Sequence, residues 1–423
     1  MEVAIGHLRM PGNPQMSTTA LPPYERSVTL QRAEHLIDTC LTDNGITCST
    51  IRHGSRLSST VATLHGVDPG RGDPIGCGKG HPDEARVGAK FEAYEHLMGP
   101  PMLRAMTHAA GRQGVLAQPQ LEGLLPLRSL GQDAAGASRT GAGRIGVIPF
   151  DGDAGNALAF PAFLIDHTYA GYPLDEDDSS YLHARRYACG TGLAAGIGRS
   201  EAEIHAIGET IERHAVGRFI ADHYFHRQVR PIRRIASRTL LPTLSALLDE
   251  AEEEIGAGIE LLDARSTIDC PVYIARCPQR ALAGIHVLGA GASLHPHLAA
   301  ERAIKELVQQ YRVADGEPQV LRDWQRSSDR LRRWPRLHRC MTLRPDEAVA
   351  VDVAYDRQAG PATRLPLDAH LHALKQRCAA AGLPVWTRLL DHHRSGVSLA
   401  CAVMPRMERF SIVALGGRVV PCW

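Results

Sequence analysis

Residues 199–219, RSEAEIHAIGETIERHAVGRF, combine two patterns that are seldom found on one helix. Apolar side chains recur every three or four positions: Ile204, Ile207, Ile211, Ala215 and Phe219. This spacing predicts a helix with one buried face. Because that face is already supplied, the acidic residues of the same segment need a separate explanation.

Glu209 and Glu212 stand three positions apart, so their side chains project from one side of this helix. Their neighbours in AIGETIERHA are mostly small or apolar and include no lysine that would pair with them. Carboxylates at the edge of a buried face require a cation or another partner. The helix therefore indicates a site for a positively charged ligand.

A glycine-containing turn followed by a helix with spaced polar residues occurs three times in the chain. The first has Gly78-Lys79-Gly80, then Glu92 and Glu95; the second has Gly190-Thr191-Gly192, then Glu209, Glu212 and Arg213; the third has Gly289-Ala290-Gly291, then Arg302, Glu306, Gln309 and Arg312. One acidic pair alone is typical of a solvated helix face, and one Gly-x-Gly alone is typical of a turn. Their recurrence favours a binding site.

The residue types in these segments suit a magnesium-nucleotide complex. Oxygen ligands for Mg²⁺ would come from four carboxylates: Glu92, Glu95, Glu209 and Glu212. Phosphate oxygens would be contacted by Lys79, Arg213, Arg302, Gln309 and Arg312. Glycines would let the backbone pass close to the ligand, and the helix N-termini favour anions. Because no Walker loop of the form GxxxxGK[ST] is present, such an ATP site would be of an uncommon kind.

Composition excludes several classes of protein. The 47 basic and 46 acidic residues leave a net charge of +1, which predicts no nucleic-acid partner. The N-terminal residues lack a basic region followed by an apolar core, and no apolar run is long enough for a membrane span. The ten cysteines form no CxxC pair, which argues against a zinc knuckle. These features predict a cytoplasmic protein with no membrane partner.

The order of elements predicts an α+β (mixed α/β) fold with antiparallel sheets. Helices are expected over residues 25–45, 243–258 and 295–312, and a strand over 156–166. Three strand-like runs, residues 259–264, 271–277 and 284–293, precede the last of these helices. Residues 1–44 are expected to be an N-terminal extension, partly disordered with a short helix, and residues 45–423 a single catalytic domain.

At these residues the chain resembles the YcaO family of ATP-dependent enzymes that activate peptide backbone amides. In the second segment TGLAAG precedes His205-x-x-x-Glu209-x-x-Glu212-Arg213, where the family has a serine at the first position. The first segment keeps GKG and both glutamates, but Gly88 replaces the serine and His96 the arginine. The third segment has the family's Arg-x-x-x-Glu-x-x-Gln-x-x-Arg in full. The resemblance extends from about residue 45 to the end and implies a YcaO-like fold with three motif-bearing helices.

The resemblance also implies cofactors and site residues. ATP and Mg²⁺ would be the cofactors, with Glu92, Glu95, Glu209 and Glu212 on the metal. The nucleotide would be positioned by Lys79, Thr191, Arg213, Arg302, Glu306, Gln309 and Arg312. In such enzymes a nucleophile adds to a peptide carbonyl, and the oxyanion then attacks the γ-phosphate of ATP. Phosphoryl transfer of this kind needs mainly positioning and charge neutralisation.

The C-terminus departs from the family pattern. Azoline-forming members often end in a proline-rich tail that reaches the active site, whereas this chain ends GGRVVPCW with a single proline in that stretch. The carboxylate of Trp423 is the only candidate for a catalytic group that the resemblance supplies. Without it the chemistry would differ.

The resemblance implies a precursor peptide as substrate and a separate leader-peptide-binding or TfuA-like protein as partner, since no recognition domain is visible; a homodimer is left open. Azoline-forming cyclodehydration in ribosomal peptide biosynthesis is the leading expectation. Thioamide formation with external sulfide, amidine formation, and a nucleotide-binding scaffold that only stimulates its partner are the alternatives.

Overall fold

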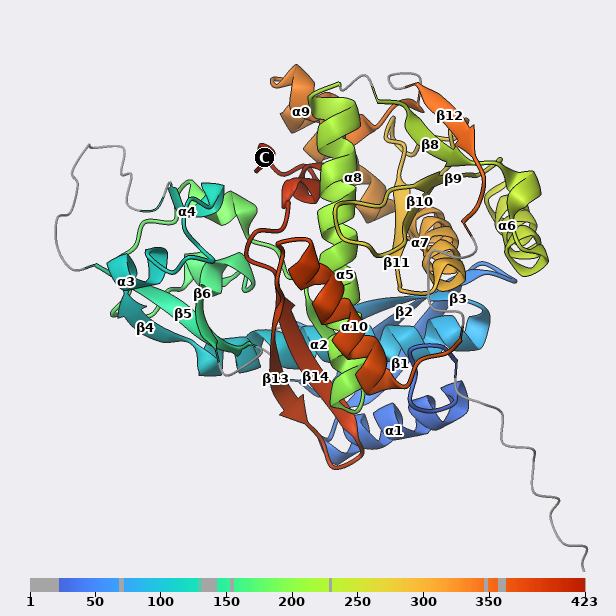
Figure 1. The fold of residues 1–423 in the computed structure, drawn as a ribbon. Coiled ribbons are helices and arrows are strands. Elements are labelled where there is room, and N and C mark those ends of the chain that lie inside the picture. Colours follow the sequence, from blue (N-terminus) through green and yellow to red (C-terminus); the bar gives the residue numbers. More distant parts are fainter. Residues whose placement is uncertain are drawn as a thin grey trace, which may run out of the picture.

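The fold is given by a computed structural model (Figure 1). It describes residues 23–67, 72–128, 130, 143–152, 156–227, 230–345, 349–356 and 363–422. Residues 1–22, which were expected to be disordered, and Trp423 lie outside the described residues.

The helices follow the apolar periodicity of the sequence. They are α1 (Leu30–Asp43), α2 (Pro82–Met106), α3 (Arg112–Leu116), α4 (Leu125–Arg128), α5 (Arg199–Ile220), α6 (Pro242–Ile255), α7 (Pro296–Gly316), α8 (Pro318–Leu331), α9 (Pro335–Thr342) and α10 (Leu367–Ala380). The expected helices at 243–258 and 295–312 are therefore confirmed as α6 and α7. Helix α6 ends at Gly256, which adopts the left-handed conformation that favours glycine at a helix C-terminus.

The described strands form three sheets. They are β1 (Thr47–His53), β2 (Ser58–His65), β3 (Ile75–Gly80), β4 (His108–Gly111), β5 (Arg144–Asp151), β6 (Ala157–Pro161), β7 (Leu193–Ile197), β8 (Ile232–Ile235), β9 (Glu260–Asp263), β10 (Val272–Arg276), β11 (Leu288–Ala292), β12 (Ala350–Val353), β13 (Trp386–His392) and β14 (Val397–Val403). Their orders are β1-β2-β3, β11-β10-β9-β8-β12 and β4-β5-β13-β14-β7, with β6 paired to β5.

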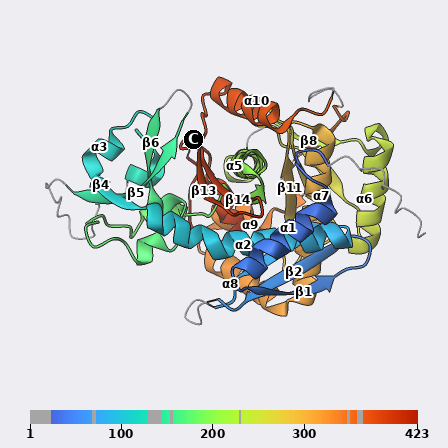
Figure 2. The same cartoon turned by 90° about the horizontal axis from the view of Figure 1, so that it is seen from below.

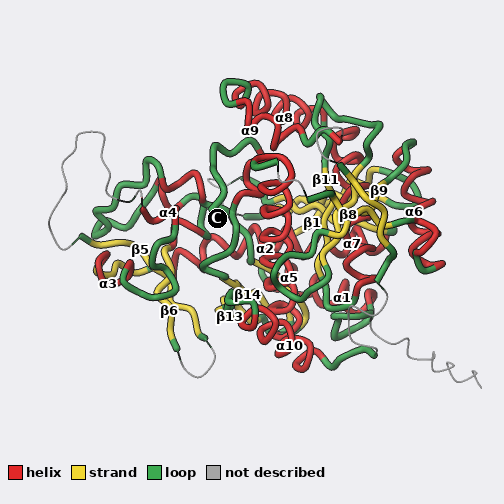
Figure 3. Tube along the Cα trace, turned by 45° about the horizontal axis from the view of Figure 1, so that its top comes forward, coloured by secondary structure: helices red, strands yellow, loops and turns green. Residues whose placement is uncertain are grey.

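The predicted α+β class with antiparallel sheets is confirmed. All strand pairs are antiparallel except β8 with β12, which is parallel. The run expected to be a strand over 156–166 is shorter, because the chain turns into a 3-10 helix at Ala162–Leu164. Figure 3 shows the strands β4–β6 and β8–β9 at opposite ends of the molecule.

Helix α1 begins later than the sequence suggested, at Leu30 rather than at Glu25. Thr29 is the N-cap residue, and its side chain accepts a hydrogen bond from the amide of Arg32. The helix buries Ile37, Cys40 and Leu41 in the same core as the rest of the chain. The division of the chain at residue 44 remains a prediction.

Each motif segment is a strand that runs directly into the helix packed against it: β3 into α2, β7 into α5, and β11 into α7. A Cβ atom at Gly78 would overlap the backbone of Ala85 and Ala89 in α2, and one at Gly291 would overlap α7 at Ala299. These two glycines were expected to admit a ligand. They instead let the strand backbone approach the helix, because the contact leaves no room for a side chain.

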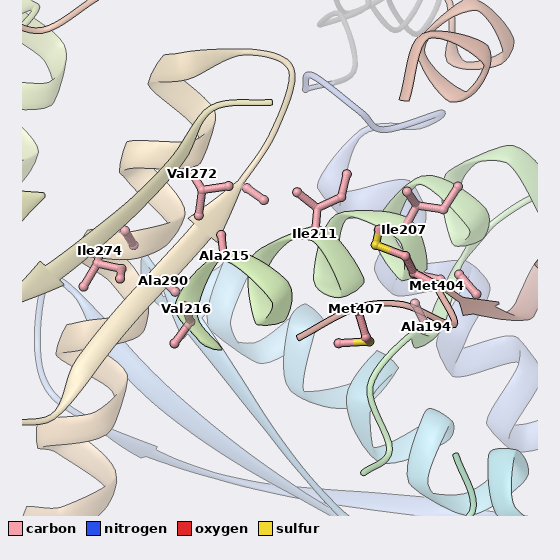
Figure 4. Packing of buried hydrophobic residues seen from close by; sticks show 14 of the residues in the cluster. Ala194, Ile207, Ile211, Ala215, Val216, Val272, Ile274, Ala290, Met404 and Met407 are labelled. Carbon is pink, nitrogen blue, oxygen red and sulfur yellow. The ribbon is translucent and has the colours of Figure 1, made fainter. Parts of the chain in front are cut away.

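Helix α5 lies at the centre of the molecule and contacts both β14 and β11 (Figure 2). Its apolar residues Ile207, Ile211 and Ala215 pack among residues from both sides, including Ala290 and Met404 (Figure 4). Because α5 is covered on most of its circumference, several of its polar residues are also buried: Glu201, Glu203, Thr210, Glu212 and His214. Each of them therefore needs a partner inside the protein.

Within the described ranges, no helix combines the length and apolar character that crossing a membrane would require.

Candidate functional site

The first and third motif segments are joined directly by their polar side chains. The ammonium of Lys79 on β3 lies 2.5 Å from a carboxylate oxygen of Glu306 on α7. The amide of Gln309, one turn further along α7, donates to the carbonyl of Cys77. These contacts place the Glu306–Gln309 face of α7 against β3.

The four glutamates of α5 are partnered in two different ways. Glu201 accepts hydrogen bonds from the backbone and hydroxyl of Ser27, each at 2.8 Å, and Glu203 pairs with Arg199 at 2.7 Å. Glu209 and Glu212, in contrast, lie 3.7 and 3.9 Å from the same atom, Nε of Arg213. Glu201 and Glu203 thus each have a donor within 2.8 Å, whereas the cation that Glu209 and Glu212 share lies at least 3.7 Å from either of them.

The electrostatics of the two motif glutamates reflect this difference. Burial raises the pKa of Glu212 to about 7, and the nearby charge of Glu306 adds to the shift. Burial likewise raises the pKa of Glu209, against the opposing effects of Arg213 and of a hydrogen bond from the amide of Gly192 at 3.0 Å. At both carboxyls, burial therefore outweighs the opposing charges of Arg213 and Lys79.

Helix α2 brings two further carboxylates toward α5. Glu92 accepts the amide of Cys77 at 3.1 Å, and Glu95 accepts the amide of Ala195 on β7 at 2.7 Å. Burial raises the pKa of both carboxyls, well above its usual range for Glu95, and the charge of Glu209 raises both further. Glu92, Glu95 and Glu209 therefore lie within electrostatic reach of one another, and Glu209 also acts on Glu212.

Several cations also act on the residues of the site. The charge of Lys79 lowers the pKa of Glu92, Glu209 and Glu212, against the larger effect of burial. Burial lowers the pKa of His205 to about 3, and the charges of Arg26, Arg302 and Lys79 lower it further. His205, which replaces the family's serine at the start of the second motif, is therefore within electrostatic range of three cations.

The site groups are surrounded by protein and yet accessible to water. The side chain of Glu209 is 29% exposed and that of Lys79 is 32% exposed. His205 is exposed although the surrounding protein disfavours its charged form. Side chains that are surrounded by protein but still partly exposed to water can contact a ligand.

The donor set fits magnesium bound together with phosphates. Carboxylate oxygens are its preferred protein ligands, and a divalent cation would relieve the repulsion among these glutamates. In the described parts of the chain, no three His, Cys, Asp or Glu side chains are grouped closely enough to hold a metal ion by themselves. Because Mg²⁺ usually keeps water and phosphate oxygens in its shell, one or two carboxylates suffice. The individual metal ligands remain a prediction.

Two predicted nucleotide residues have other surroundings in the structure. The guanidinium of Arg312 lies 2.6 Å from a carboxylate oxygen of Glu254 on α6, so it ties α7 to α6. Thr191 stands in the turn before β7, next to the Gly192 amide that binds Glu209. The nucleotide roles of Arg312 and Thr191 stay predictions.

The two departures in the first motif have structural consequences. Nδ1 of His96, in place of an arginine, lies 2.5 Å from the carbonyl of Ile75. Gly88 packs against β3, where a Cβ atom would meet Cα of Gly78 at 3.6 Å. The cation that the family places here is therefore replaced by a ring that contacts the adjacent strand.

The C-terminal tail is held by a buried carboxylate that the sequence did not indicate. Glu408 is fully buried and accepts the amides of Cys422 at 2.9 Å and Phe410 at 3.0 Å. Its Cγ would lie 3.0 Å from a Cβ atom at Gly217, one turn beyond Arg213 on α5. Trp423, the predicted catalytic candidate, lies outside the described residues, and its role stays a prediction.

Residues just before α1 were missed as site residues. Arg26 acts on Glu95 and His205, and Glu25 forms an ion pair with Arg302 at 2.7 Å. No motif marks these positions, because they belong to an irregular segment whose neighbours are set by tertiary packing. Their only sequence signal is a pair of opposite charges.

The sequence and the fold are both similar to those of known proteins. Residues 77–408 match the model of a family described as YcaO cyclodehydratase, ATP- and Mg²⁺-binding. The fold is similar to that of YcaO from Methanopyrus kandleri bound with AMPPCP and Mg²⁺, with a TM-score of 0.63 and 21% identity over 93% of this chain and 95% of that chain. No curated protein matches the sequence.

Two further structures are similar at lower identity. A heterocyclase in complex with substrate and cofactor has a TM-score of 0.61 and 15% identity over 90% of this chain, which spans 52% of that longer chain. The Escherichia coli microcin synthetase McbBCD complex has a TM-score of 0.53 and 11% identity over 85% of this chain and 88% of that chain. At these identities the structures show that the fold is shared, which confirms the expected fold.

Proposed function

The chain belongs to the YcaO family, whose members bind ATP and Mg²⁺, and on this premise we propose that it activates backbone amides of a ribosomally made precursor peptide. The observation that carries the proposal is that burial and mutual repulsion raise the pKa of the motif carboxylates, Glu92, Glu95, Glu209 and Glu212, while three cations act on the neighbouring His205. Buried carboxylates that repel one another suit a metal, and several cations that act on one position suit phosphates.

The acidic and the basic residues of the site would have different roles. The motif glutamates would hold Mg²⁺, while Lys79, Arg213 and Arg302 would neutralise charge on the phosphate oxygens. When bound, ATP would supply the phosphoryl group that converts the amide oxygen into a leaving group. Lys79 is suited to its part because Glu306 holds its ammonium and about a third of the side chain remains exposed.

Azoline formation is the reaction we propose. The family is described as a cyclodehydratase family, and a heterocyclase with substrate and cofactor shares the fold. A Cys, Ser or Thr side chain of the peptide would be the nucleophile. The product would be a thiazoline or an oxazoline, formed with loss of one water.

A peptide substrate and a protein partner belong to the same proposal. The McbBCD complex, which shares the fold, is an assembly of several proteins and has also been seen with pro-MccB17 bound. A separate leader-peptide-binding or TfuA-like protein would deliver the peptide here. A homodimer and a cytoplasmic location remain predictions.

Mass spectrometry of a candidate peptide incubated with the protein, its partner and ATP tests this function. A loss of about 18 Da per modified residue is the expected result. A gain of about 16 Da would show thioamide formation instead, and an unchanged mass with steady ADP release would exclude both products. Omitting Mg²⁺ provides the control, because phosphoryl transfer should then stop.

A further inference from the structure

The segment Tyr24–Ser27 contacts α5 although about 170 residues separate the two in sequence. Both the amide and the hydroxyl of Ser27 donate to Glu201 at 2.8 Å, and the same hydroxyl donates to the carbonyl of Ile197 at 2.9 Å. Arg26 adds an ion pair with Glu201 at 3.1 Å. The segment is therefore a packed part of the site rather than a loose approach to α1.

Glu25 is the most deeply buried residue of this segment, with 5% of its surface exposed. One carboxylate oxygen lies 2.7 Å from Arg302 on α7. The other accepts the hydroxyl of Ser293 and lies 3.2 Å from Nε2 of His370. Burial would raise the pKa of Glu25, but Arg302 and His370 outweigh it and hold that pKa well below its usual range. The carboxylate is charged and both of its oxygens are engaged.

The backbone conformation of Glu25 also indicates that the position of its side chain is tightly constrained. Its φ of 58° lies in the left-handed region, which non-glycine residues seldom adopt. Such a conformation persists where surrounding contacts over-determine it, and it often accompanies a functional constraint. The strained turn is what lets the side chain of Glu25 point toward α7 while Arg26 and Ser27 contact α5.

Arg302 is held at two nitrogens. Nη2 pairs with Glu25, and Nη1 donates to the carbonyl of Ala292 at 2.9 Å. Its side chain is still 23% exposed, and its charge acts on His205 in the site. The guanidinium is thereby fixed in direction while part of it stays accessible.

We propose that Glu25 is a positioning residue for nucleotide binding, acting through its buried ion pair with Arg302. The inference rests on the proposed function, because it assumes that Arg302 contacts a phosphate. A buried ion pair is weak support for stability, since removal from water costs about as much as the pairing returns. Groups that orient a ligand-binding side chain through a second hydrogen bond are, however, needed for affinity.

A competing reading makes the opposite prediction. If Glu25 simply occupied the place of a phosphate on Arg302, its removal would free the arginine and tighten nucleotide binding. If Glu25 orients Arg302, its removal weakens binding. The sign of the change in affinity therefore decides between the two.

The test is calorimetric titration of wild type and Glu25→Gln with Mg-AMPPCP and, separately, with adenosine. We expect the substitution to weaken Mg-AMPPCP binding about tenfold or more. Adenosine affinity should be unchanged, because adenosine carries no phosphate; an equal loss for both ligands would show a general structural effect and overturn the inference. Glu34→Gln is the matched control, since Glu34 also belongs to the N-terminal region but pairs with Arg86 and Lys90.

Ser293→Ala provides a second variant if Glu25→Gln does not fold. It removes the hydroxyl that donates to Oε1 of Glu25 and that also accepts the amide of His295 at 2.9 Å. A smaller loss in the same direction, about threefold, is expected, again for Mg-AMPPCP and not for adenosine. Unchanged or tighter Mg-AMPPCP binding in either folded variant overturns the inference. Failure of the wild type to bind Mg-AMPPCP at all would sink the proposed function and this inference together.

Discussion

The ammonium of Lys79 lies 2.5 Å from a carboxylate oxygen of Glu306, although 227 positions separate the two residues. Glu306 is largely buried, with 9% of its side chain exposed, whereas Lys79 remains partly open to water. Lys79 also lowers the pKa of Glu209 and Glu212 on α5. One cation on β3 thus acts on carboxylates of both α7 and α5.

Replacement of Lys79 by Met should weaken nucleotide binding. The variant loses a phosphate-facing charge and the cation that offsets the site carboxylates, so the Kd for Mg-AMPPCP should rise at least about tenfold. Unfolding free energy should also fall, by about 1–3 kcal/mol, because the largely buried Glu306 is left without its cation. Lys375→Met is the control, since Lys375 pairs with Glu203 at 3.5 Å. Equal losses of affinity in both variants would show that the effect is not local to the site.

Glu209→Gln and Glu203→Gln should have opposite effects, although both residues lie on α5. Glu203→Gln breaks close pairs with Arg199 and Lys375, so unfolding free energy should fall by about 1–3 kcal/mol while nucleotide affinity is kept. Glu209→Gln relieves repulsion among the carboxylates, so stability should hold or rise while Mg-AMPPCP affinity falls. Urea unfolding and calorimetry measure the two quantities. Parallel changes in both variants would contradict the assignment of Glu209 to the ligand site.

Alanine at Gly78 and at Gly88 should also differ in sign, although these two residues face each other between β3 and α2. At Gly78 a Cβ atom would collide with the backbone of Ala85 and Ala89, so a loss of about 1–3 kcal/mol is expected. At Gly88 the Cβ atom would make an ordinary contact within a helix, so a gain of up to about 1 kcal/mol is expected. Thermal and urea denaturation test both. A destabilised Gly88→Ala would show that the space beside β3 is smaller than described.

The free energy of unfolding should decrease as the pH falls, because His214 is harder to protonate in the folded protein than in the unfolded one. Burial, with a smaller effect of Arg218, lowers the pKa of His214 to about 4, and its Nδ1 accepts the amide of Glu408 at 2.9 Å. The unfolded imidazole takes up a proton below about pH 6.5, whereas the folded one resists until about pH 4. The contribution is therefore full above pH 6.5 and is lost as pH falls toward 4.

Comparison of wild type with His214→Gln isolates this effect. Between pH 7 and pH 5 the unfolding free energy of wild type should drop by about 2 kcal/mol more than that of the variant. Urea unfolding at the two pH values measures the difference. Equal drops in both proteins would mean that His214 is already protonated in the folded state.

Helix positions were predictable where periodicity was strong. The expected segments at 243–258 and 295–312 became α6 and α7, because a buried stripe at helical spacing admits few other structures. The start of α1 was placed five residues too early, since the capping by Thr29 competes with continued helix. That small error hid Glu25 and Arg26, which reach the site only because the helix begins after them.

The glycines of the first and third motif segments show that one sequence pattern can have two structural reasons. Gly78 and Gly291 were assigned to ligand approach, whereas the structure uses them for contact between a strand and its own helix. From the sequence, both uses require the same absence of a side chain. Only the packing partner distinguishes them.

By itself the sequence determined which residues are the candidates for the chemistry, because helical spacing alone puts Glu209 and Glu212 on one side of α5 and because three similar segments repeat. Tertiary structure alone decided which of these residues meet, that Lys79 pairs with Glu306, and that Glu25 pairs with Arg302. The physical reason is the distance along the chain over which each interaction acts. Helix periodicity is a local property of the backbone, whereas an ion pair between distant segments depends on how the whole chain packs and on the burial that makes an unpaired charge costly.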